Sequence, residues 1–510
     1  MGKKREDREK GKKARGDSEC NLDGEYKIPV RSFRDLTAGN IREAVLHSRY
    51  LQILLSLTII GAILRFYNLG FNSLWLDEAT TYNIAIKSIP DIWQVTAGGE
   101  FNPPLFHWAE NVMLMLGNNE VILRFLPALL GVLTIPLFYL VGKEFFDRNV
   151  GIIAAAGCAF SPFLIYYSQE ARAYSMLLFF VALGTLFFMK GLKSSRLTNW
   201  ALFGVFFALA FWTHFYAFVM IAALVLYALI VLAPRMPAEL NKVKMLLTGG
   251  AIFIILCLPL IIVTIKLFAI RTAYSPTYGI QGLGIITETF TQISGFNTLS
   301  LIVLLVLFAV GSIQAFFVDK NKALFLVLLT ILTFVISYVL SFKMPMLPRY
   351  LIFLSLVLFI GSAMSYRAFY SLWNSKAIVY MMMAVMVLIS VPVLANYYSA
   401  YSKEDWRGFS GILTEKGAPG DMVIIVPGYI AQPLNYYYSS QKAGTKEYQA
   451  TTGTDLEKIY SGKGNSTMFF VVTGDINAAN PNGDALVWIE NNTHFAGEDS
   501  TGGIYLFTNP

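Results

Sequence analysis

The chain has 510 residues, of which 55% are hydrophobic and only 14% are charged, whereas a typical soluble domain carries about 25% charged residues. This composition excludes an ordinary soluble globular protein and predicts many membrane spans. The formal net charge of +7 comes in part from a basic N-terminal segment. We interpret that segment as a cytoplasmic tail beside a membrane and not as a nucleic-acid site.

The first apolar segment begins near Tyr50, too late for an ordinary cleaved signal peptide. We therefore expect residues 1–49 to form a retained basic tail, followed by a signal anchor. Cys20 lies in this tail, and Cys158 and Cys257 lie in apolar segments. No cysteine falls in a predicted external segment, so no disulfide framework is predicted.

Windows without charged residues predict eleven membrane spans between residues 50 and 398, since one helix needs about 20 apolar residues to cross a bilayer. We expect Trp212-Thr213-His214 to form a tight turn between two short spans. The predicted spans lie near residues 50–66, 122–142, 149–167, 173–189, 198–212, 214–233, 246–266, 298–318, 323–341, 349–366 and 377–396.

Charge distribution predicts the orientation of the chain in the membrane. Lys and Arg gather in the loops after even-numbered spans, whereas segment 69–120 has one basic residue, Lys87, and six acidic residues. Cytoplasmic loops are enriched in Lys and Arg. We therefore place the N-terminus in the cytoplasm and both segment 69–120 and the C-terminus outside the plasma membrane.

The C-terminal region, residues 399–510, differs in character from the apolar part. A helix is predicted over Glu404–Lys416, and strands over Met422–Pro427, Met468–Val472 and Ile504–Phe507. Alternating helices and strands indicate a small external α/β domain. The predicted fold class is therefore a polytopic all-α membrane protein, spanning residues 50–398, with a small C-terminal α/β soluble domain.

Two other external segments are long. Segment 69–120 contains amphipathic stretches, roughly residues 78–88 and 103–117, which we expect to lie along the membrane interface. Segment 267–297 is polar, aromatic and contains glycine. We expect it to be a mobile loop over a site.

Two adjacent acids, Asp77 and Glu78, follow Trp75 soon after the first span. Carboxylates just outside a bilayer are costly unless they are hydrated, paired or used. A carboxylate can deprotonate a hydroxyl acceptor or bind a divalent metal ion. The alternative is an N-cap and a first-turn acid for the helix that follows. Both interpretations can hold together if Glu78 caps the helix and Asp77 is the reacting carboxylate.

Two more polar residues lie near the same predicted membrane face. His107 follows the rigid Pro103-Pro104 pair and either hydrogen-bonds a carboxylate or ligates a metal, although a lone histidine is more often a satisfied polar contact. Arg124 lies at the external mouth of the second span. It either reaches the interface as an anchor or binds a lipid phosphate.

Further candidates lie in the outer turns between later spans. Glu170 and Arg172 share a short turn, where the alternative is a local ion pair of small energy. His214 lies in the next outer turn. Arg349 and Tyr350 open the tenth span, where Arg349 either neutralises a phosphate leaving group or anchors the helix at the interface. The predicted topology places all these residues at one membrane face.

Four segments of the chain, in this order and spacing, resemble the GT-C glycosyltransferases of the protein O-mannosyltransferase and lipid A aminoarabinose transferase type (glycosyltransferase family 39-like). The resemblance covers roughly residues 60–220 and is looser at Pro348-Arg349-Tyr350. The four segments are Leu69–Glu78, Asn102–His107, Leu123–Gly131 and Tyr167–Tyr174.

The resemblance implies a GT-C-like helical fold and an inverting transferase, with or without a metal ion, that uses a polyprenyl-phosphate sugar. It implies that Asp77 is the catalytic base and that Glu78 supports it or contacts a metal. The candidates for binding the donor phosphate are Arg124, Arg172 and Arg349. The candidates for contacts with substrate or metal are Trp75, His107, Glu170, His214 and Tyr350.

The chemistry of such a transfer agrees with these residues. A phosphate leaving group needs cations, and the acceptor needs one base, whereas a glycosidase needs two separated carboxyl groups. We therefore predict a membrane glycosyltransferase that moves a sugar from a dolichyl- or undecaprenyl-type phosphate to an acceptor hydroxyl or amine outside the cytoplasm. A divalent metal cofactor stays open, as does the choice between a glycan, lipid or protein acceptor.

Two alternative functions are weighed against the transferase. A transporter or flippase of lipid-linked sugars predicts ionisable residues near the middle of spans and pseudo-symmetric halves, and the sequence shows neither. A cell-envelope scaffold explains the C-terminal domain but leaves the first external segment unexplained.

Overall fold

The computed structural model describes residues 20–23, 38–100, 102–273, 275–399, 403–496 and 502–510. Most of the predicted basic tail, residues 1–49, therefore lies outside the described residues. The chain forms two compact units. The first comprises Met1–Arg65, Leu129–Ser168 and Ala173–Val393, and the second comprises Phe66–Ala128, Gln169–Arg172 and Leu394–Pro510.

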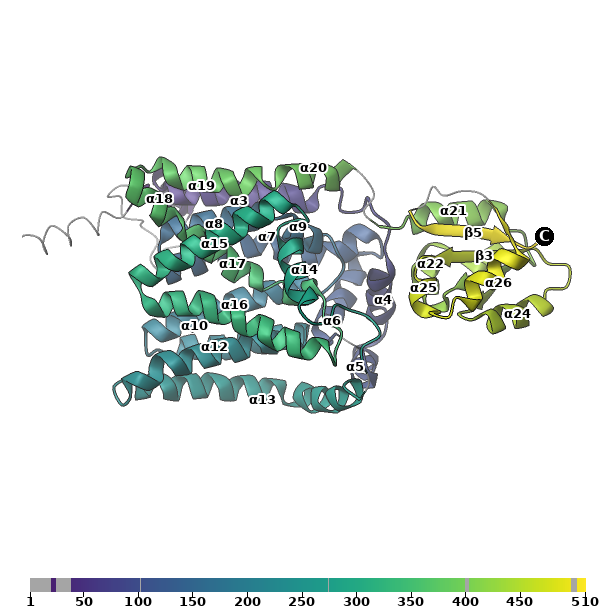
Figure 1. Cartoon of the computed structure of the whole chain (residues 1–510), viewed down its shortest axis with the longest axis horizontal. Coiled ribbons are helices and arrows are strands. Elements are labelled where there is room, and N and C mark those ends of the chain that lie inside the picture. The colour runs from purple at the N-terminus through teal and green to yellow at the C-terminus, as the bar shows by residue number, and fades with distance from the viewer. Residues whose placement is uncertain (1–19, 24–37, 101, 274, 400–402, 497–501) are drawn as a thin grey trace, which may run out of the picture. The chain divides into compact units, whose positions relative to one another are not determined.

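The first unit is a bundle of long apolar helices that run side by side (Figure 1). Helix α7 (Glu120–Phe145) begins in the second unit and continues into the first, and α20 (Val391–Ser399) begins in the first unit and continues into the second. The others are α2 (Ala38–His47), α3 (Arg49–Phe66), α8 (Arg148–Phe160), α9 (Pro162–Ser168), α10 (Tyr174–Lys193), α11 (Leu197–Thr213), α12 (Ala217–Leu232), η3 (Ala233–Arg235), α13 (Leu240–Arg271), α14 (Gly284–Ile293), α15 (Thr298–Val318), α16 (Lys320–Ser341), η4 (Pro348–Leu351), α17 (Leu354–Met364), α18 (Tyr366–Trp373) and α19 (Ala377–Leu388).

Eight helices in the described part of the chain are long and apolar enough to cross a membrane, or nine if the bent pair α8 and α9 counts as one span. Nine of the eleven predicted windows thus pass this test of length and hydropathy, with the bent pair counted as one span. The window at 198–212 is the shorter helix α11, and the window at 349–366 is divided between η4 and α17. The predicted turn near residues 212–214 is confirmed, because α11 ends at Thr213 and α12 begins at Ala217.

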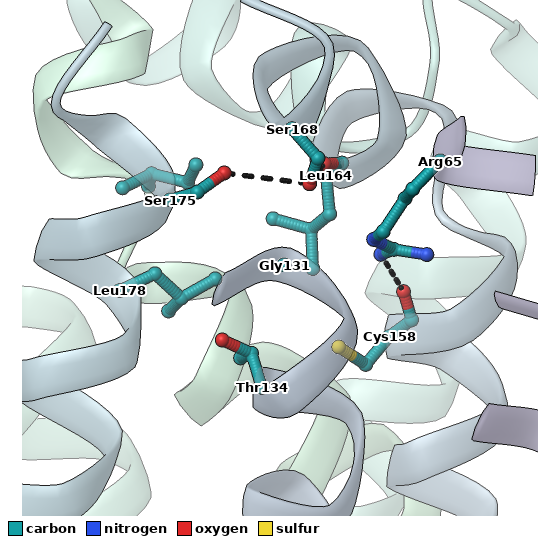
Figure 2. A pocket seen from close by; sticks show the side chains of 9 residues that line it. Arg65, Gly131, Thr134, Cys158, Leu164, Ser168, Ser175 and Leu178 are labelled. Carbon is teal, nitrogen blue, oxygen red and sulfur yellow. Dashed lines mark hydrogen bonds between the residues drawn. The ribbon is translucent and has the colours of Figure 1, made fainter. Parts of the chain in front are cut away.

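A buried arginine supports the 58° bend between α8 and α9. The Arg65 guanidinium donates hydrogen bonds to the carbonyl oxygens of Cys158 at 2.9 Å and Ala159 at 3.0 Å, at the end of α8 (Figure 2). Carbonyls in the last turn of a helix have no partner within the helix. Arg65 satisfies two of them, so the helix ends cleanly before Pro162 starts α9, which leads directly into the turn at residues 169–172.

The segment at residues 267–297 is not the bare loop that the sequence predicts. Helix α13 continues to Arg271, and α14 occupies Gly284–Ile293. Ile285 and Ile293 of α14 are buried, and the backbone N–H of Ile280 donates to the Met346 carbonyl at 2.8 Å. Residues at helical spacing give this segment a buried face. The polar composition of the segment as a whole does not indicate that face.

The second unit combines the first predicted external segment with the C-terminal region. Its helices are α4 (Leu76–Ala85), α5 (Ile89–Gly98), α6 (Leu105–Met113), η2 (Leu114–Leu116), α21 (Trp406–Lys416), η5 (Gly428–Ile430), α22 (Ala431–Tyr437), α23 (Ser440–Ala443), α24 (Gly453–Ser461), α25 (Ile476–Ala479) and α26 (Asp484–Asn492). Its strands are β1 (Met422–Val426), β2 (Lys446–Gln449), β3 (Met468–Thr473), β4 (His494–Phe495) and β5 (Ile504–Thr508).

The strands form one five-stranded sheet in the order β2-β1-β3-β5-β4. Strand β1 is parallel to β2 and β3, with Val423 opposite Phe469, and β5 is antiparallel to β3 and β4. Each face of the sheet packs on its own apolar core, one around Trp406 and the other around Leu456. The predicted C-terminal helix and the three predicted strands are confirmed.

Contacts between α4 and α22 join the two parts of the second unit. Thr80 donates a hydrogen bond to Gln432 at 2.9 Å, and the rings of Tyr82 and Tyr436 lie edge to face at 4.8 Å. The Tyr437 hydroxyl accepts from the Leu74 backbone N–H at 2.8 Å. The predicted boundary at residues 398 and 399 separates these parts, whereas the structure groups them in one compact unit.

Candidate active site

The first turn of α4 carries a fully buried carboxylate, Glu78. Its two oxygens accept hydrogen bonds from Nε and Nη2 of Arg124, both at 2.7 Å. The Oε1 atom also accepts the backbone N–H of Ala171 at 2.8 Å. A bidentate carboxylate–guanidinium pair fixes geometry as well as adding energy, so Glu78 joins the start of α4, the start of α7 and the turn at residues 169–172.

Arg124 is 1% exposed, and it uses its remaining N–H groups on backbone carbonyls. These carbonyls belong to Leu69, Asn72 and Ser73, at 2.9, 2.8 and 3.0 Å. A guanidinium has five N–H groups, so all of them have partners inside the protein. The arrangement favours a framework role for Arg124 over the predicted contact with a donor phosphate.

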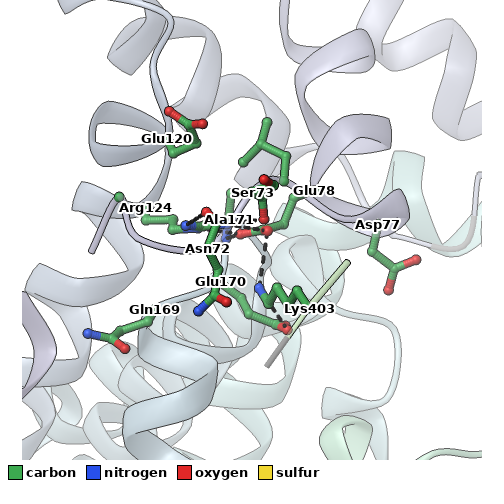
Figure 3. Close-up of polar contacts among 12 residues, drawn as sticks. Asn72, Ser73, Asp77, Glu78, Glu120, Arg124, Gln169, Glu170, Ala171 and Lys403 are labelled. Atoms are coloured by element: carbon green, nitrogen blue, oxygen red, sulfur yellow. Dashed lines mark hydrogen bonds and ion pairs between the residues drawn. The ribbon is translucent and has the colours of Figure 1, made fainter. Parts of the chain in front are cut away.

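A lysine that the sequence analysis missed completes this buried cluster. Lys403 has a 6% exposed side chain, and its Nζ lies 3.1 Å from Glu78 Oε2 and 3.4 Å from Glu170 Oε1 (Figure 3). It also lies 5.7 Å from the ring centre of Trp75, a cation–π contact. No local pattern around Lys403 marks it, because its partners lie hundreds of positions earlier in the chain.

The electrostatics of this cluster keep Glu78 ionised. Burial alone raises the pKa of the Glu78 carboxyl, but the charges of Arg124 and Lys403 outweigh burial and lower its pKa to about 2. Each of its oxygens is already in contact with a donor. Glu78 is therefore poorly placed to accept a proton from a substrate, and its role is to hold other groups in place.

Asp77 points away from this cluster, although it is the neighbour of Glu78 in the chain (Figure 3). Its side chain is 25% exposed, and the nearest Arg172 nitrogen lies 3.8 Å from its carboxylate. Arg172 also donates to the Asp77 backbone carbonyl at 3.0 Å and to Thr81 at 3.2 Å. Asp77 is thus an oriented carboxylate that a substrate can reach.

Neither acid occupies the N-cap position of α4. The N-cap position of α4 is Trp75, and its side chain makes no capping bond. The N-cap alternative for Asp77 and Glu78 is therefore wrong, while both acids do lie in the first helical turn. There they interact favourably with the positive end of the helix dipole.

His107 and Glu110 lie on the buried face of α6, which packs on α4. Among the described residues, neither ring nitrogen of His107 and neither carboxyl oxygen of Glu110 has a hydrogen-bond partner. Burial, helped by Arg172, lowers the pKa of His107 to about 3, and burial, helped by Glu78, raises that of Glu110 well above its usual value. Burial thus favours the uncharged form of both side chains, and the expected polar contact of His107 is not found within the described residues.

The other predicted residues lie together in the first unit. The rings of His214 and Tyr350 are 5.1 Å apart, and Tyr216 stacks on Tyr350 at 5.2 Å. The Arg349 guanidinium lies 5.8 Å from the ring centres of Tyr174 and Tyr350. The predicted site residues thus form two clusters, one in each unit, and the acids belong to the second.

The described side chains contain no ready-made cluster of metal ligands. Within the described ranges, no group of three or more His, Cys, Asp or Glu side chains is arranged to hold a metal ion. Two other acids of the second unit, Glu78 and Glu170, both contact Lys403. The proposed chemistry below therefore uses protein groups alone.

Comparison with known proteins places this geometry in context. Residues 102–263 match the family described as dolichyl-phosphate-mannose-protein mannosyltransferase. A protein from Aquifex aeolicus (strain VF5), described as uncharacterized, is 30% identical over 129 residues, which is 24% of this chain. The match spans 26% of the length of that relative.

The fold is shared with solved membrane proteins at low sequence identity. Apo ArnT from Cupriavidus metallidurans is similar with a TM-score of 0.58 and 12% identity over 89% of this chain and 97% of ArnT. The apo oligosaccharyltransferase of Archaeoglobus fulgidus gives a TM-score of 0.55 and 12% identity over 91% of this chain and 74% of that protein. ArnT bound to undecaprenyl phosphate is similar with a TM-score of 0.52 and 12% identity over 89% and 98% of the two chains.

These similarities define the class of fold. The chain is a multi-pass membrane protein with the GT-C fold of glycosyltransferases and a small C-terminal sheet domain. The resemblance predicted from the four sequence segments is therefore confirmed, and three of those segments lie wholly or partly within residues 102–263.

Proposed function

We propose that this protein is a membrane glycosyltransferase that moves a sugar from a polyprenyl-phosphate carrier to an acceptor outside the cytoplasm. The observation that carries the proposal is the contrast between two adjacent acids. Glu78 is fully buried and held by Arg124, Ala171 and Lys403. Asp77 is partly exposed and oriented by Arg172, as a general base for a substrate must be.

The fold supports a lipid-linked donor. ArnT has been solved with undecaprenyl phosphate, and the archaeal oligosaccharyltransferase AglB with dolichol-phosphate and an inhibitory peptide. AglB resembles this chain with a TM-score of 0.55 and 12% identity. A donor anchored in the bilayer needs an enzyme whose site lies at the membrane, and a multi-pass bundle meets that need.

The chemistry assigns one role to each group. The Asp77 carboxylate accepts the proton of the acceptor hydroxyl or amine as the acceptor atom attacks the anomeric carbon of the sugar. The bond between that carbon and the phosphate oxygen breaks, and the polyprenyl phosphate leaves with the electron pair. Attack opposite the leaving group inverts the anomeric configuration. Within the second unit, Arg172 is the cation that we assign to the phosphate, because Arg124 has no N–H group left for it.

A transfer assay tests the proposal. The purified full-length protein is placed in liposomes with undecaprenyl phosphate mannose, labelled in the sugar, and a membrane extract that supplies acceptors. We expect labelled product together with an equal amount of undecaprenyl phosphate. Movement of intact donor across the bilayer without cleavage would instead support the transporter alternative. A panel of other polyprenyl-phosphate sugars in the same assay then identifies the sugar.

A further inference from the structure

We propose that Lys403 is a positioning residue of the transfer site, through which the C-terminal α/β domain sets the geometry of the turn at residues 169–172 and of Asp77. The inference rests on the proposed transferase function. It assigns to the C-terminal domain a part in the active site itself, in addition to any part in binding an acceptor.

A single ammonium group, that of Lys403, lies between two buried acids. Lys403 Nζ contacts Glu78 at 3.1 Å and Glu170 at 3.4 Å. These two carboxylates are 0% and 1% exposed. Buried carboxylates are strongly unfavourable without a partner charge. Lys403 therefore stabilises both acids at once, and one end of each contact belongs to the turn or to α4.

The turn at residues 169–172 links this ammonium group to Asp77. The backbone N–H of Ala171 donates to Glu78 at 2.8 Å, and that of Arg172 donates to the Glu170 carbonyl at 2.7 Å. The turn is thus tied to the Glu78 and Lys403 cluster on one side. On its other side, Arg172 contacts the backbone carbonyl and the carboxylate of Asp77. A shift of Lys403 moves the turn, and the turn carries the residue that orients Asp77.

The C-terminal domain fixes the position of Lys403. Asp405, two residues later, caps α21 and accepts a hydrogen bond from Ser73 at 2.8 Å. The backbone N–H of Arg407 donates to the same Ser73 hydroxyl at 3.1 Å. Trp406 between them is fully buried in the domain core. The start of α21 is therefore attached both to the domain and to the segment that precedes α4. Lys403 lies three residues before the first residue of α21, so these contacts also restrict its position.

A second contact from the same part of the chain reaches the turn independently. The Tyr397 hydroxyl donates to the Gln169 side-chain oxygen at 2.7 Å, and the Gln169 amide donates to the Tyr67 carbonyl at 2.8 Å. The turn is thus held at its first residue by Tyr397 and at its second by Lys403. Holding these two neighbouring residues limits the freedom of the turn, as a site that must present one carboxylate in one geometry requires.

The experiment compares Lys403→Met, Lys403→Gln and Lys403→Arg with Lys416→Met, an exposed position in the last turn of α21. Transfer from undecaprenyl phosphate mannose gives kcat and KM for each folded variant. Hydrogen–deuterium exchange of the peptide that covers residues 169–172 gives a readout that does not depend on activity. Misplacement of a catalytic group by about 1 Å costs about 100-fold in rate.

We expect Lys403→Met and Lys403→Gln to lower kcat about 100-fold and to speed exchange at residues 169–172. Lys403→Arg recovers most of the rate, and Lys416→Met behaves as wild type in both measurements. A Lys403→Met variant with wild-type kcat and wild-type exchange overturns the proposal. So does a variant that loses folded protein while its folded fraction keeps wild-type kcat, because that result assigns Lys403 to stability alone.

The exchange measurement also separates this inference from the proposed function. If the wild-type protein transfers no sugar from any donor, the transferase assignment fails. Faster exchange at residues 169–172 in Lys403→Met then still supports control of the turn by the C-terminal domain. Unchanged exchange contradicts that control whatever the activity.

Discussion

The Glu78 carboxylate and the Arg124 guanidinium form a buried bidentate ion pair with two nitrogen–oxygen distances of 2.7 Å. The pair fastens the first turn of α4 to the first turn of α7. It also gives the two adjacent acids different roles, because it engages both oxygens of Glu78 and leaves Asp77 as the carboxylate that a substrate can reach.

Replacing Arg124 with Met should strongly destabilise the protein, because Glu78 is then left buried with Lys403 as its remaining cation. Breaking a buried pair costs about 3–5 kcal/mol. Arg124→Lys should restore only part of the stability, since an ammonium group cannot form the fork that meets both oxygens. Thermal unfolding in detergent measures both. Wild-type stability of Arg124→Met contradicts the framework role.

Removing Arg172 should slow transfer without unfolding the protein. Its contact with the Asp77 carboxylate is long, 3.8 Å, and its hydrogen bonds to the Asp77 carbonyl and to Thr81 add some stability that the variant loses. The orientation of the base depends on these contacts, so kcat is measured on the folded fraction. We expect Arg172→Met to lower kcat about 100-fold and Arg172→Lys to lie between Met and wild type. Arg196→Met, at an exposed position before α11, is the control. An unchanged kcat in Arg172→Met counts against this assignment.

The buried Glu110 should make the stability of the folded protein depend on pH in an unusual direction. Burial, helped by Glu78, raises the pKa of its carboxyl well above the usual value of 4.5. Above pH 4.5 the unfolded chain releases this proton while the folded chain keeps it, so stability falls as pH rises towards the raised pKa. Glu110→Gln should remove this part of the slope. Unfolding curves across that range test it, with Glu490→Gln at an exposed position of α26 as control. The same slope in Glu110→Gln and wild type refutes the prediction.

An apolar residue at the same position should stabilise the fold. Both Glu110 oxygens are buried and lack a hydrogen-bond partner within the described residues, and each unsatisfied buried polar group costs about 1–3 kcal/mol. Glu110→Met keeps the volume of the side chain and removes both oxygens. We expect a higher unfolding temperature in the variant, and a lower one shows that the carboxyl has a partner.

Sequence patterns revealed those features that depend on short stretches of chain. Hydropathy located the long helices, and alternation of helices and strands located the C-terminal sheet, because both depend on neighbouring residues. Breaks within the apolar windows were not predicted, because local hydropathy does not show where a helix ends. Arg65 supports the end of α8 before Pro162, and a change of helix type divides the window at 349–366.

Local sequence patterns reveal even less of the candidate site, because its contacts join residues far apart in the chain. The motif around Asp77 is local and identifies the pair of acids, but the different surroundings of Asp77 and Glu78 come from Arg124, Arg172 and Lys403. Lys403 lies 325 positions after Glu78, so no spacing rule relates them. Glu110 reads as an acid of an amphipathic helix, and only the packing of α6 on α4 reveals that it is buried without a partner.

The central claim is that Asp77 is the general base, and the transfer rate of Asp77→Asn tests it most directly. General-base catalysis contributes about 10²–10⁴-fold, so we predict a loss of that size in kcat. Donor binding and unfolding temperature should stay at wild-type values, and the control Asp91→Asn, at an exposed position of α5, should keep full activity. Transfer by folded Asp77→Asn at a near wild-type rate would contradict the account.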